Sequence, residues 1–348
     1  NRENFPMIRR PTTDRRSALK LVAGTGASLA LPGILTQTTA QGLDKFSYNT
    51  NWRAQAEHGG FYYALANGLY KEAGIDADIR MGGPQLNMSQ ILVGGVVDMV
   101  MSNSFEAINY ARENLPFLVI GSIFQKDPQV LISHPGVGHD KVESLKGKPI
   151  LIGGTSRTSF WLYLKAKYGF TDEQIRPYTF NIQPFVADKQ VTQQGFLSSE
   201  PYAIEKETGI KPVVHLIADT GFANYNTTLT TSRKLITEKK DVVQRFVDAT
   251  LKGWAEYIKA GPGNAAANAL IQKANPDMTQ DKIDYAIKVM NEYGIVKSGD
   301  ALKLGIGAMT DERWKNFYDT MSAAGAFPTG IDYKKAYSLD FVNKGIGA

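Results

Sequence analysis

Cysteine is missing from the sequence altogether. Its absence excludes disulfide bonds, cysteine-ligated zinc or iron–sulfur sites, and a thiol nucleophile. Long apolar stretches are missing too: no run of about 18 uninterrupted apolar residues occurs, so we expect no membrane-spanning helix. Hydrophobic residues nevertheless make up 43% of the 348 residues, which is enough to build a buried core. A chain of this length is expected to form about two domains.

The sequence patterns of several common catalytic sites are also absent. The chain has four histidines, which are His58, His134, His139 and His215. They do not show the His-Glu-x-x-His spacing of a zinc site. There is no Gly-x-Ser-x-Gly sequence for an activated serine, and the segment 153–159 lacks the glycine and lysine spacing of a nucleotide P-loop. We therefore assign no catalytic residue and expect no metal or cofactor.

The excess of positive charge is confined to one end of the chain. The formal net charge is +5. Residues 1–40 contain six basic and two acidic side chains, so they hold four of these five charges. The remaining body is almost neutral and lacks the basic stripe expected of a nucleic-acid-binding protein. We therefore expect no nucleic-acid partner.

Residues 1–40 have the layout of an export signal. Arg15-Arg16 is followed by a moderately apolar run over 21–35, and the small residues Thr38-Thr39-Ala40 suit signal peptidase. The segment resembles a bacterial twin-arginine signal peptide, which implies cleavage after Ala40 and a periplasmic location. The alternative is a basic arm that binds DNA or lipid, but such an arm does not explain the apolar run. An oxidising compartment is compatible with a chain that lacks cysteine.

From residue 46 onward, short apolar strands alternate with amphipathic helices. The expected strands cover 46–50, 75–80, 98–101, 117–124, 150–152, 179–182, 213–217 and 227–231. The expected helices cover 60–73, 85–93, 104–113, 153–168, 240–260, 265–273, 279–293 and 311–324. This alternation predicts an α/β fold in which mostly parallel sheets carry helices on both faces. We expect two such lobes, joined by extended crossings that act as a hinge.

Candidate binding residues lie in the loops that follow the expected strands, because sheets of this class bind ligands at the carboxyl ends of their strands. The richest loop contains Asn51, Trp52, His58 and Gly59. Trp52 is suited to stacking on a flat ring, and Asn51 offers both donor and acceptor atoms. Gly59 leaves backbone amides accessible to a ligand. The alternatives are that Trp52 packs between sheet and helix and that His58 is a structural hydrogen-bonding residue.

Small polar residues follow one strand in each half of the chain. Ser102, Asn103 and Ser104 precede a helix in the first half, and Thr155, Ser156 and Arg157 precede one in the second. The second group offers hydroxyls and a cation to a carboxylate, sulfonate or phosphate. Helix capping is the alternative role for both groups.

Four further residues complete the expected binding site. Glu200 follows a short strand, where its carboxylate is placed to accept hydrogen bonds from an amino-substituted heterocycle; an exposed turn acid is the alternative. Tyr225 lies just before the crossing that returns to the first half. We also assign Tyr62, in the first helix, and Gly83, in the turn after the second strand, to the site.

Several short motifs occur in a family-specific order along the chain. They are Asn51-Trp52, His58-Gly59-Gly60, GLYKEAGI over 68–75, LVGGVVD over 92–98, Ser199-Glu200-Pro201-Tyr202 and YSLDF over 337–341. With these motifs, the segment 43–342 resembles periplasmic solute-binding proteins of ABC importers, in the group related to thiamine-pyrimidine biosynthesis proteins. That group also includes nitrate-, alkanesulfonate-, taurine- and riboflavin-related binders.

The resemblance implies a bilobal type II periplasmic-binding-protein fold. Lobe one then comprises 43–131 and 230–348, and lobe two comprises 132–229. The ligand is expected between the lobes, and closure of the monomer around it is expected to be recognised by an ABC permease in the inner membrane. In pyrimidine-binding members an aromatic residue stacks on the ring and a glutamate of the second lobe binds its amino group; Trp52 and Glu200 match these positions.

Two departures from the family pattern bear on function. Eukaryotic pyrimidine synthases of this superfamily carry a cysteine-rich segment, which this chain lacks, so a pyrimidine-synthesis enzyme is only a distant alternative. The second lobe reads QQGFL over 193–197 where the family has Gly-x-x-Asp. We expect a receptor for a small planar nitrogen heterocycle of the thiamine-pyrimidine kind. The alternative ligands are anions, namely an alkanesulfonate, nitrate or an aromatic carboxylate, held by the loop 154–159.

Overall fold

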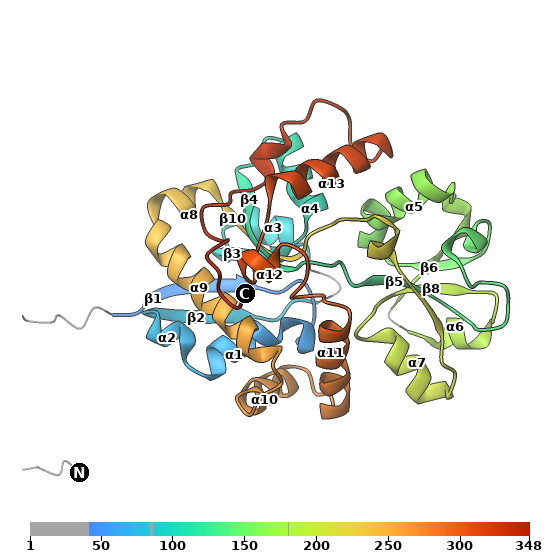
Figure 1. Ribbon diagram of the computed structural model, residues 1–348, viewed down its shortest axis with the longest axis horizontal. Helices are drawn as coiled ribbons and strands as arrows, with labels where there is room; N and C mark the ends of the chain where they lie inside the picture. Colours follow the sequence, from blue (N-terminus) through green and yellow to red (C-terminus); the bar gives the residue numbers. More distant parts are fainter. Residues whose placement is uncertain (1–41, 84–85, 180) are drawn as a thin grey trace, which may run out of the picture. The chain divides into compact units, whose positions relative to one another are not determined.

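The computed structural model describes residues 42–83, 86–179 and 181–348. The export signal expected over 1–40 lies outside these residues. The described chain is built around two five-stranded sheets, each flanked by helices (Figure 1). None of the helices in this part of the chain combines the length and apolarity that crossing a membrane requires.

The first sheet has the strand order β2-β1-β3-β10-β4. Its strands are β1 (Asp44–Asn49), β2 (Ile75–Arg80), β3 (Met99–Ser102), β4 (Phe117–Phe124) and β10 (Asn226–Ser232). β1 pairs in parallel with β2 and β3, whereas β10 runs antiparallel to β3 and β4. The register places Asp44 opposite Ile75 and Thr230 opposite Val100. β10 is the strand that brings the chain back from the second sheet.

The second sheet repeats this plan with the order β7-β6-β8-β5-β9. Its strands are β5 (Gln129–Ser133), β6 (Ile150–Ile152), β7 (Ile175–Pro177), β8 (Thr192–Phe196) and β9 (Val213–Leu216). β6 is parallel to β7 and β8, and β5 is antiparallel to β8 and β9. The predicted pair of mostly parallel sheets is therefore confirmed. Each sheet is mixed, because one strand runs against the others.

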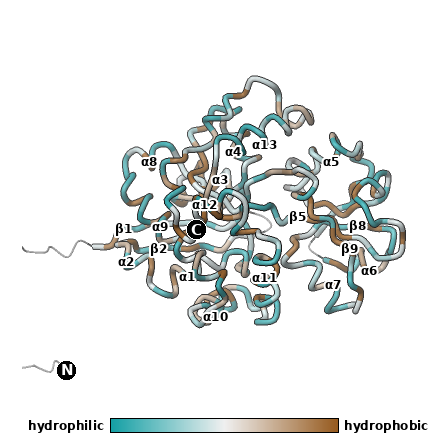
Figure 2. Tube along the Cα trace, in the orientation of Figure 1, coloured by the Kyte–Doolittle hydropathy of each residue, from teal (hydrophilic) through white to brown (hydrophobic). Residues whose placement is uncertain are grey.

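Helices cover both sheets. They are α1 (Gly59–Ala66), α2 (Leu69–Glu72), α3 (Met88–Val93), α4 (Ser104–Arg112), α5 (Phe160–Tyr168), α6 (Gln183–Ala187), α7 (Glu200–Thr208), α8 (Arg233–Glu238), α9 (Lys240–Tyr257), α10 (Asn264–Ala274), α11 (Gln280–Glu292), α12 (Ala301–Leu304) and α13 (Asp311–Ala323). Short 3₁₀ turns include η1 (Ala56–His58), η3 (Thr155–Thr158) and η5 (Ile217–Thr220). Figure 2 shows hydrophobic residues concentrated in strands such as β5 and β8, whereas α7 and α8 are mostly hydrophilic.

We refer to the first sheet with α1–α4 and α8–α13 as the first lobe, and to the second sheet with α5–α7 as the second lobe. Gly42–Ala348 forms one compact unit that contains both lobes. The residue limits 43–131, 132–229 and 230–348 that the sequence suggests for the lobes stay a prediction.

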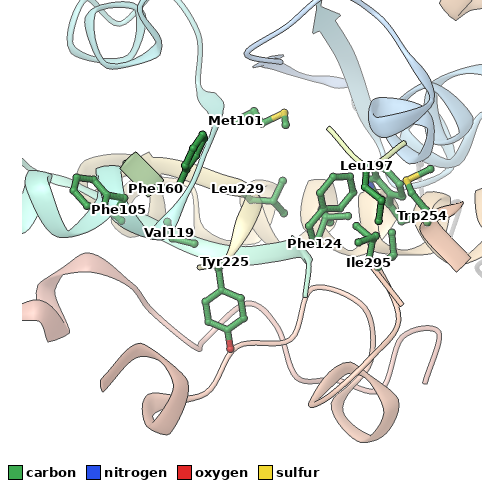
Figure 3. Close-up of a cluster of buried hydrophobic side chains, with 14 of the residues drawn as sticks. Met101, Phe105, Val119, Phe124, Phe160, Leu197, Tyr225, Leu229, Trp254 and Ile295 are labelled. Carbon is green, nitrogen blue, oxygen red and sulfur yellow. The ribbon is translucent and has the colours of Figure 1, made fainter. Parts of the chain in front are cut away.

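Glycines bring α1 and α9 into close contact. A Cβ atom on Gly59 would lie 1.9 Å from the Tyr257 ring, and one on Gly60 would lie 2.1 Å from Trp254. A Cβ on Gly253 would lie 2.4 Å from the Gly60 carbonyl oxygen. Trp254 is fully buried and also meets the Phe124 ring edge-on at 5.8 Å, within the core drawn in Figure 3. The glycines therefore let the aromatic face of α9 reach the helix that follows the first loop.

The sequence misplaced two elements. The helix expected over 60–73 is broken between α1 and α2, because Gly68 adopts a left-handed φ of 80° that a continuous helix does not contain. The strand expected over 179–182 is wrong: the strand at this edge of the second sheet is β7, which pairs with β6 through Ile175–Pro177. β5, α6, α7, α8 and α12 were not predicted at all.

Two extended segments connect the lobes, one between β4 and β5 and one between η5 and β10. The Asp127 carboxylate in the first segment accepts a hydrogen bond of 2.6 Å from the Asn224 amide in the second. The Arg313 guanidinium of α13 donates to the Gln125 carbonyl in the first segment and to the Ala223 carbonyl, at 3.3 Å, in the second. These hydrogen bonds hold the two connections to each other and to α13.

Candidate functional site

A cavity of about 120 Å³ lies where the two lobes meet. One wall is η1 with the residue before it, a second is the turn into α7 and the first part of that helix, and a third is the segment leading into α11. The lining residues are Gln55, Glu57, Ser198, Ser199, Tyr202, Ala203, Asp277, Met278 and Lys282. The cavity is therefore enclosed by segments that are far apart in the sequence.

Glu57 is the most deeply buried charged residue of this cavity, with 2% of its surface exposed. Its carboxylate accepts a hydrogen bond from the Ser198 hydroxyl, so the contact joins the first lobe to the second. Burial raises the pKa of Glu57 to about 7, and the nearby negative charge of Glu200 acts in the same direction. Near neutral pH this carboxyl group is therefore divided between its protonated and ionised forms.

Glu200 is the first residue of α7 and turns its carboxylate back toward its own lobe. One oxygen accepts a hydrogen bond of 2.7 Å from the Phe196 backbone N–H, and the other accepts one of 3.0 Å from the Tyr178 hydroxyl. Burial raises the pKa of Glu200 above its ordinary value, although these hydrogen bonds oppose the shift. The charge of Glu200 therefore affects the pKa of Glu57, but Glu200 does not line the cavity.

Charged groups from both lobes meet beside the cavity. The Lys206 ammonium of α7 lies 2.5 Å from the Asp281 carboxylate of α11, which also accepts a hydrogen bond from the Tyr202 hydroxyl. The Tyr202 ring stacks on Tyr285 with centroids 4.6 Å apart. This group of contacts holds α7 of the second lobe against α11 of the first.

The loop after β1 approaches the turn after β2. The Gly82 backbone N–H donates to the Trp52 carbonyl at 3.0 Å, and a Cβ on Gly82 would lie 2.1 Å from the Thr50 carbonyl oxygen. Asn51 and Trp52 are half-buried, as is the neighbouring Gly83. The structure brings these three predicted site residues together in one loop pair, outside the lining of the 120 Å³ cavity.

His58, Gly59 and Tyr62 are packed into the first lobe. Burial lowers the pKa of His58 to about 3, so its imidazole is neutral at physiological pH. Gly59 faces the Tyr257 ring, as described above. Tyr62 is 4% exposed, and burial raises its pKa to about 12. The immediate surroundings of these residues are protein side chains of the first lobe, and their expected contact with a ligand stays a prediction.

The residues at the start of α4 make structural contacts. The Asn103 side chain caps the helix by accepting a hydrogen bond of 3.1 Å from the Glu106 backbone N–H, as the capping alternative predicts. The Ser102 hydroxyl donates to the Glu106 carboxylate at 2.7 Å. The Ser104 hydroxyl accepts a hydrogen bond of 2.9 Å from the Tyr225 backbone N–H. Ser104 is therefore bound to the segment that returns from the second lobe.

Tyr225 is fully buried in the first lobe. Its ring points away from Leu229 toward the C-terminal segment (Figure 3), where its hydroxyl accepts a hydrogen bond of 3.1 Å from the Thr310 backbone N–H. The Arg313 guanidinium lies 4.0 Å from the centre of the ring. These contacts direct Tyr225 toward α13.

The predicted anion loop of the second lobe coincides with η3. Ser156 is buried and Arg157 is exposed. The Gly153 backbone N–H at the entrance of this loop donates to the Gln194 side chain at 2.6 Å. The side chain of Thr155 is outside the described part of the structure, whereas Ser156 and Arg157 are described and lie outside the lining of the cavity. Nothing in the described geometry joins them to Glu57 or Ser198.

Glu57, Ser198 and Tyr202 line the cavity but were not among the predicted site residues. Glu57 carries one available signal, since it is the only carboxylate in the loop that follows the first expected strand, over 51–60. Its contact with Ser198 spans 141 residues and has no local signature. Within the described ranges, no group of three or more histidine, aspartate or glutamate side chains is arranged to hold a metal ion.

Comparison with known proteins places these features in context. The chain is 23% identical over 293 residues to the riboflavin-binding protein RibY of Chloroflexus aurantiacus, covering 82% of each protein. It is 29% identical over 109 residues to the 4-amino-5-hydroxymethyl-2-methylpyrimidine phosphate synthase of Aspergillus parasiticus, covering 31% of this chain and 32% of the synthase.

Among solved structures, the periplasmic aliphatic sulphonate binding protein SsuA of Escherichia coli matches with a TM-score of 0.61 at 13% identity. The match covers 84% of this chain and 91% of SsuA. It confirms the periplasmic-binding-protein fold that the sequence motifs imply. The NMT1/THI5-like family model matches residues 55–265, a segment that includes η1, the whole second lobe and the start of α10. The chain belongs to the NMT1/THI5-like family.

Proposed function

We propose that the protein is an extracytoplasmic receptor that captures a small planar nitrogen heterocycle of the thiamine-pyrimidine kind for an ABC importer. The family and the fold support a solute-binding role. The observation that carries the ligand class is the cavity between the lobes, where a buried carboxyl group and a hydroxyl group come from opposite sides. Carboxylates accept hydrogen bonds from the N–H groups of an amino-heterocycle.

The size of the cavity favours a ligand with one ring. Pockets for drug-sized ligands have volumes of roughly 300–1,000 Å³, whereas this cavity has about 120 Å³. A single pyrimidine ring suits the smaller space better than riboflavin, the ligand in RibY's name. We therefore favour a pyrimidine over a flavin.

The charges around the cavity favour a ligand with donors over an anion. The Lys282 ammonium at the cavity wall donates to the Asp277 carbonyl at 2.8 Å, and Arg53 lies 3.6 Å from the Asp277 carboxylate. Both cations are thus engaged by Asp277. The buried ionisable group is Glu57, whose negative charge opposes the binding of a sulfonate or nitrate. The second candidate function is that of a receptor for an anion, similar to the sulphonate-binding protein SsuA.

A panel of ligands tests the proposal directly. Thermal unfolding is measured with 4-amino-5-hydroxymethyl-2-methylpyrimidine, riboflavin, ethanesulfonate and nitrate. A ligand at 100 times its Kd stabilises the native state by about 2.7 kcal/mol, so we expect a raised Tm with the pyrimidine. A response confined to ethanesulfonate or nitrate would overturn the heterocycle proposal and favour the anion alternative. A response to none of the four would overturn both.

Trp52 is proposed as a ligand contact on the basis of the family pattern, whereas the Glu200 carboxylate, which also matches that pattern, is bound to Phe196 and Tyr178 of its own lobe. Trp52 lies half-buried in the loop after β1, near the start of the segment that leads into η1. Ring stacking contributes about 1 kcal/mol beyond the burial of area, so Trp52→Ala is expected to weaken pyrimidine binding about fivefold. Calorimetry with the pyrimidine measures this change, and unchanged affinity would remove Trp52 from the site.

The same proposal includes the location and the partner of the protein. We propose export by the twin-arginine route, a periplasmic location, a monomeric state and delivery to an inner-membrane permease. Replacement of Arg15 and Arg16 by lysine is expected to block export of the full chain, as measured by cell fractionation. The proposal also states that the protein is not a pyrimidine synthase, so incubation with candidate precursors should yield no pyrimidine product.

A further inference from the structure

We propose that Glu57, rather than Glu200, is the carboxyl group that binds the amino edge of the solute. This inference rests on the proposed function, because it concerns the same site. It identifies a specificity-determining residue in the first lobe, whereas the family pattern places the glutamate in the second.

Glu57 lines the 120 Å³ cavity, and Glu200 does not. The two oxygens of Glu200 accept hydrogen bonds from Phe196 and Tyr178, at 2.7 and 3.0 Å. Both partners belong to the second lobe, so Glu200 fixes the turn between β8 and α7. A solute in the cavity therefore contacts Glu57 rather than Glu200.

Glu57 binds a hydroxyl group of the second lobe, that of Ser198. The Ser198 hydroxyl donates to one carboxylate oxygen of Glu57 and also lines the cavity. A carboxylate has two oxygens and about four acceptor positions, so one serine leaves further acceptor capacity on the group. Ser198 therefore orients the carboxylate from the opposite lobe. A solute N–H that binds Glu57 contacts both lobes through this pair.

The titratable and charged groups near Glu57 are Glu200 and Tyr202 of α7, Tyr257 of α9, Asp277 just before α11, Lys282 of α11, and His58, the next residue in the chain. His58 and Tyr257 are neutral at physiological pH because burial lowers the pKa of the former and raises that of the latter. Lys282 donates to the Asp277 carbonyl. Glu57 therefore changes its charge near neutral pH, where its pKa lies at about 7.

A hydrogen-bond donor on the solute changes the protonation equilibrium of the Glu57 carboxyl group. A hydrogen bond to the ionised carboxylate favours the ionised form and lowers its pKa. At about pH 7, where Glu57 is divided between its two forms, binding then releases part of a proton. An anionic solute has the opposite effect, because it favours the protonated form. The same residue therefore selects amino-bearing solutes and rejects anions as the pH rises.

The test is calorimetric titration of the full chain with 4-amino-5-hydroxymethyl-2-methylpyrimidine at about pH 7, in two buffers of different ionisation enthalpy. The variants are Glu57→Gln and Glu200→Gln. Because hydrogen bonds to charged groups are stronger than neutral ones, Glu57→Gln is expected to weaken binding about tenfold. It is also expected to change the number of protons exchanged on binding, relative to the wild type.

The variants separate the possible outcomes. Glu200→Gln is expected to change affinity less than Glu57→Gln does and to retain the proton release. Circular dichroism and a thermal melt confirm that each variant is folded. Ser198→Ala removes the hydrogen bond between Ser198 and Glu57 and leaves the carboxyl group of Glu57 intact. If the wild type binds the pyrimidine but Glu57→Gln binds it equally well with the same proton exchange, this inference fails and the proposed function stands. If the wild type binds no pyrimidine, both fail.

Discussion

The hydroxyl group of Tyr202 in α7 donates a hydrogen bond to the carboxylate of Asp281 in α11, and so connects the second lobe to the first. The Lys206 ammonium lies 2.5 Å from the same carboxylate, and these contacts lower the pKa of Asp281. Tyr202 also lines the cavity beside Glu57. One side chain therefore forms part of the cavity wall and part of the contact that holds the lobes together.

Asp281→Asn is expected to weaken ligand binding without unfolding the protein. The change removes the ion pair with Lys206 and leaves the Tyr202–Tyr285 stack, which has a centroid distance of 4.6 Å. Because the closed arrangement is then less favoured, the apparent Kd for the bound solute should rise about two- to fivefold. Calorimetry measures the affinity, and small-angle scattering measures the spread of the lobes.

Asp284→Asn is a matched control for this variant. Asp284 is also exposed on α11, but its carboxylate accepts a hydrogen bond of 2.7 Å from Gln280 within the same helix. It should leave affinity unchanged. Equal behaviour of the two variants would show that the contact with Asp281 has no part in holding the lobes.

Glu57→Gln is expected to alter the pH dependence of stability. The ordinary glutamate pKa is 4.5 and that of Glu57 is about 7, so between these values the folded state binds more protons than the unfolded state. The contribution of Glu57 to stability is therefore fully present below about pH 4.5 and is lost as the pH rises through about 7. The shift corresponds to a loss of roughly 3 kcal/mol.

Urea unfolding of the wild type and Glu57→Gln across this pH range measures the effect. At about pH 8 the variant should be the more stable protein, because glutamine still accepts the Ser198 hydrogen bond but carries no charge to bury. The difference should shrink toward about pH 4.5. Glu312→Gln, at an exposed position of α13, is the control and should track the wild type at every pH. A Glu57→Gln curve parallel to that of the wild type would contradict the expected titration.

The alternation of strands and helices was predictable because it follows from local apolar patterns. The strands over 117–124 and 150–152 match β4 and β6, since both are mostly apolar runs whose residues are all buried. β7 was misplaced because its residues, Ile175–Pro177, are half-buried or exposed and show no apolar pattern. β10 was predicted as a strand. Its antiparallel direction relative to β3 and β4 was not predictable, because it depends on where the chain re-enters the first sheet.

The candidate site was less predictable because its geometry depends on contacts between distant segments. Trp52 and Glu200 stood out as residue types, yet neither lines the cavity. Glu57 is buried by α9 and by the turn before α7, which lies 141 residues along the chain at Ser198. A local pattern carries no information on such burial. The glycine at position 59 was similarly interpreted as an opening for a ligand, whereas its space is filled by the Tyr257 ring.

Gly253→Ala is expected to destabilise the first lobe. The new Cβ would lie 2.4 Å from the Gly60 carbonyl oxygen and 2.8 Å from the Ala64 methyl group, so α1 and α9 would have to separate. Overpacking of a core costs about 1–3 kcal/mol, and it should outweigh the better helix propensity of alanine. Urea unfolding measures the loss. Gly261→Ala is the control, since no atom lies within 4 Å of its added Cβ; a Gly253→Ala protein as stable as this control would contradict the packing argument.

Arg313→Lys is expected to loosen the connection between the lobes. The guanidinium donates to carbonyl groups in both connecting segments, at Gln125 and Ala223, and lies 4.0 Å from the centre of the Tyr225 ring. A lysine keeps the charge but has a single ammonium group, which cannot reproduce the planar fork or the stacking. A buried carbonyl left without its donor costs about 1–3 kcal/mol.

Two measurements detect this change at Arg313. Urea unfolding should report a loss of stability in that range, and limited proteolysis should cut Arg313→Lys faster within 125–128 and 221–225, where the connecting segments depend on the guanidinium. Lys315→Arg, at an exposed position on the same helix with its ion pair to Asp319, should behave as the wild type does. Cleavage at the same rate in both variants would mean that the Asp127–Asn224 hydrogen bond of 2.6 Å is sufficient to hold the two segments together without Arg313.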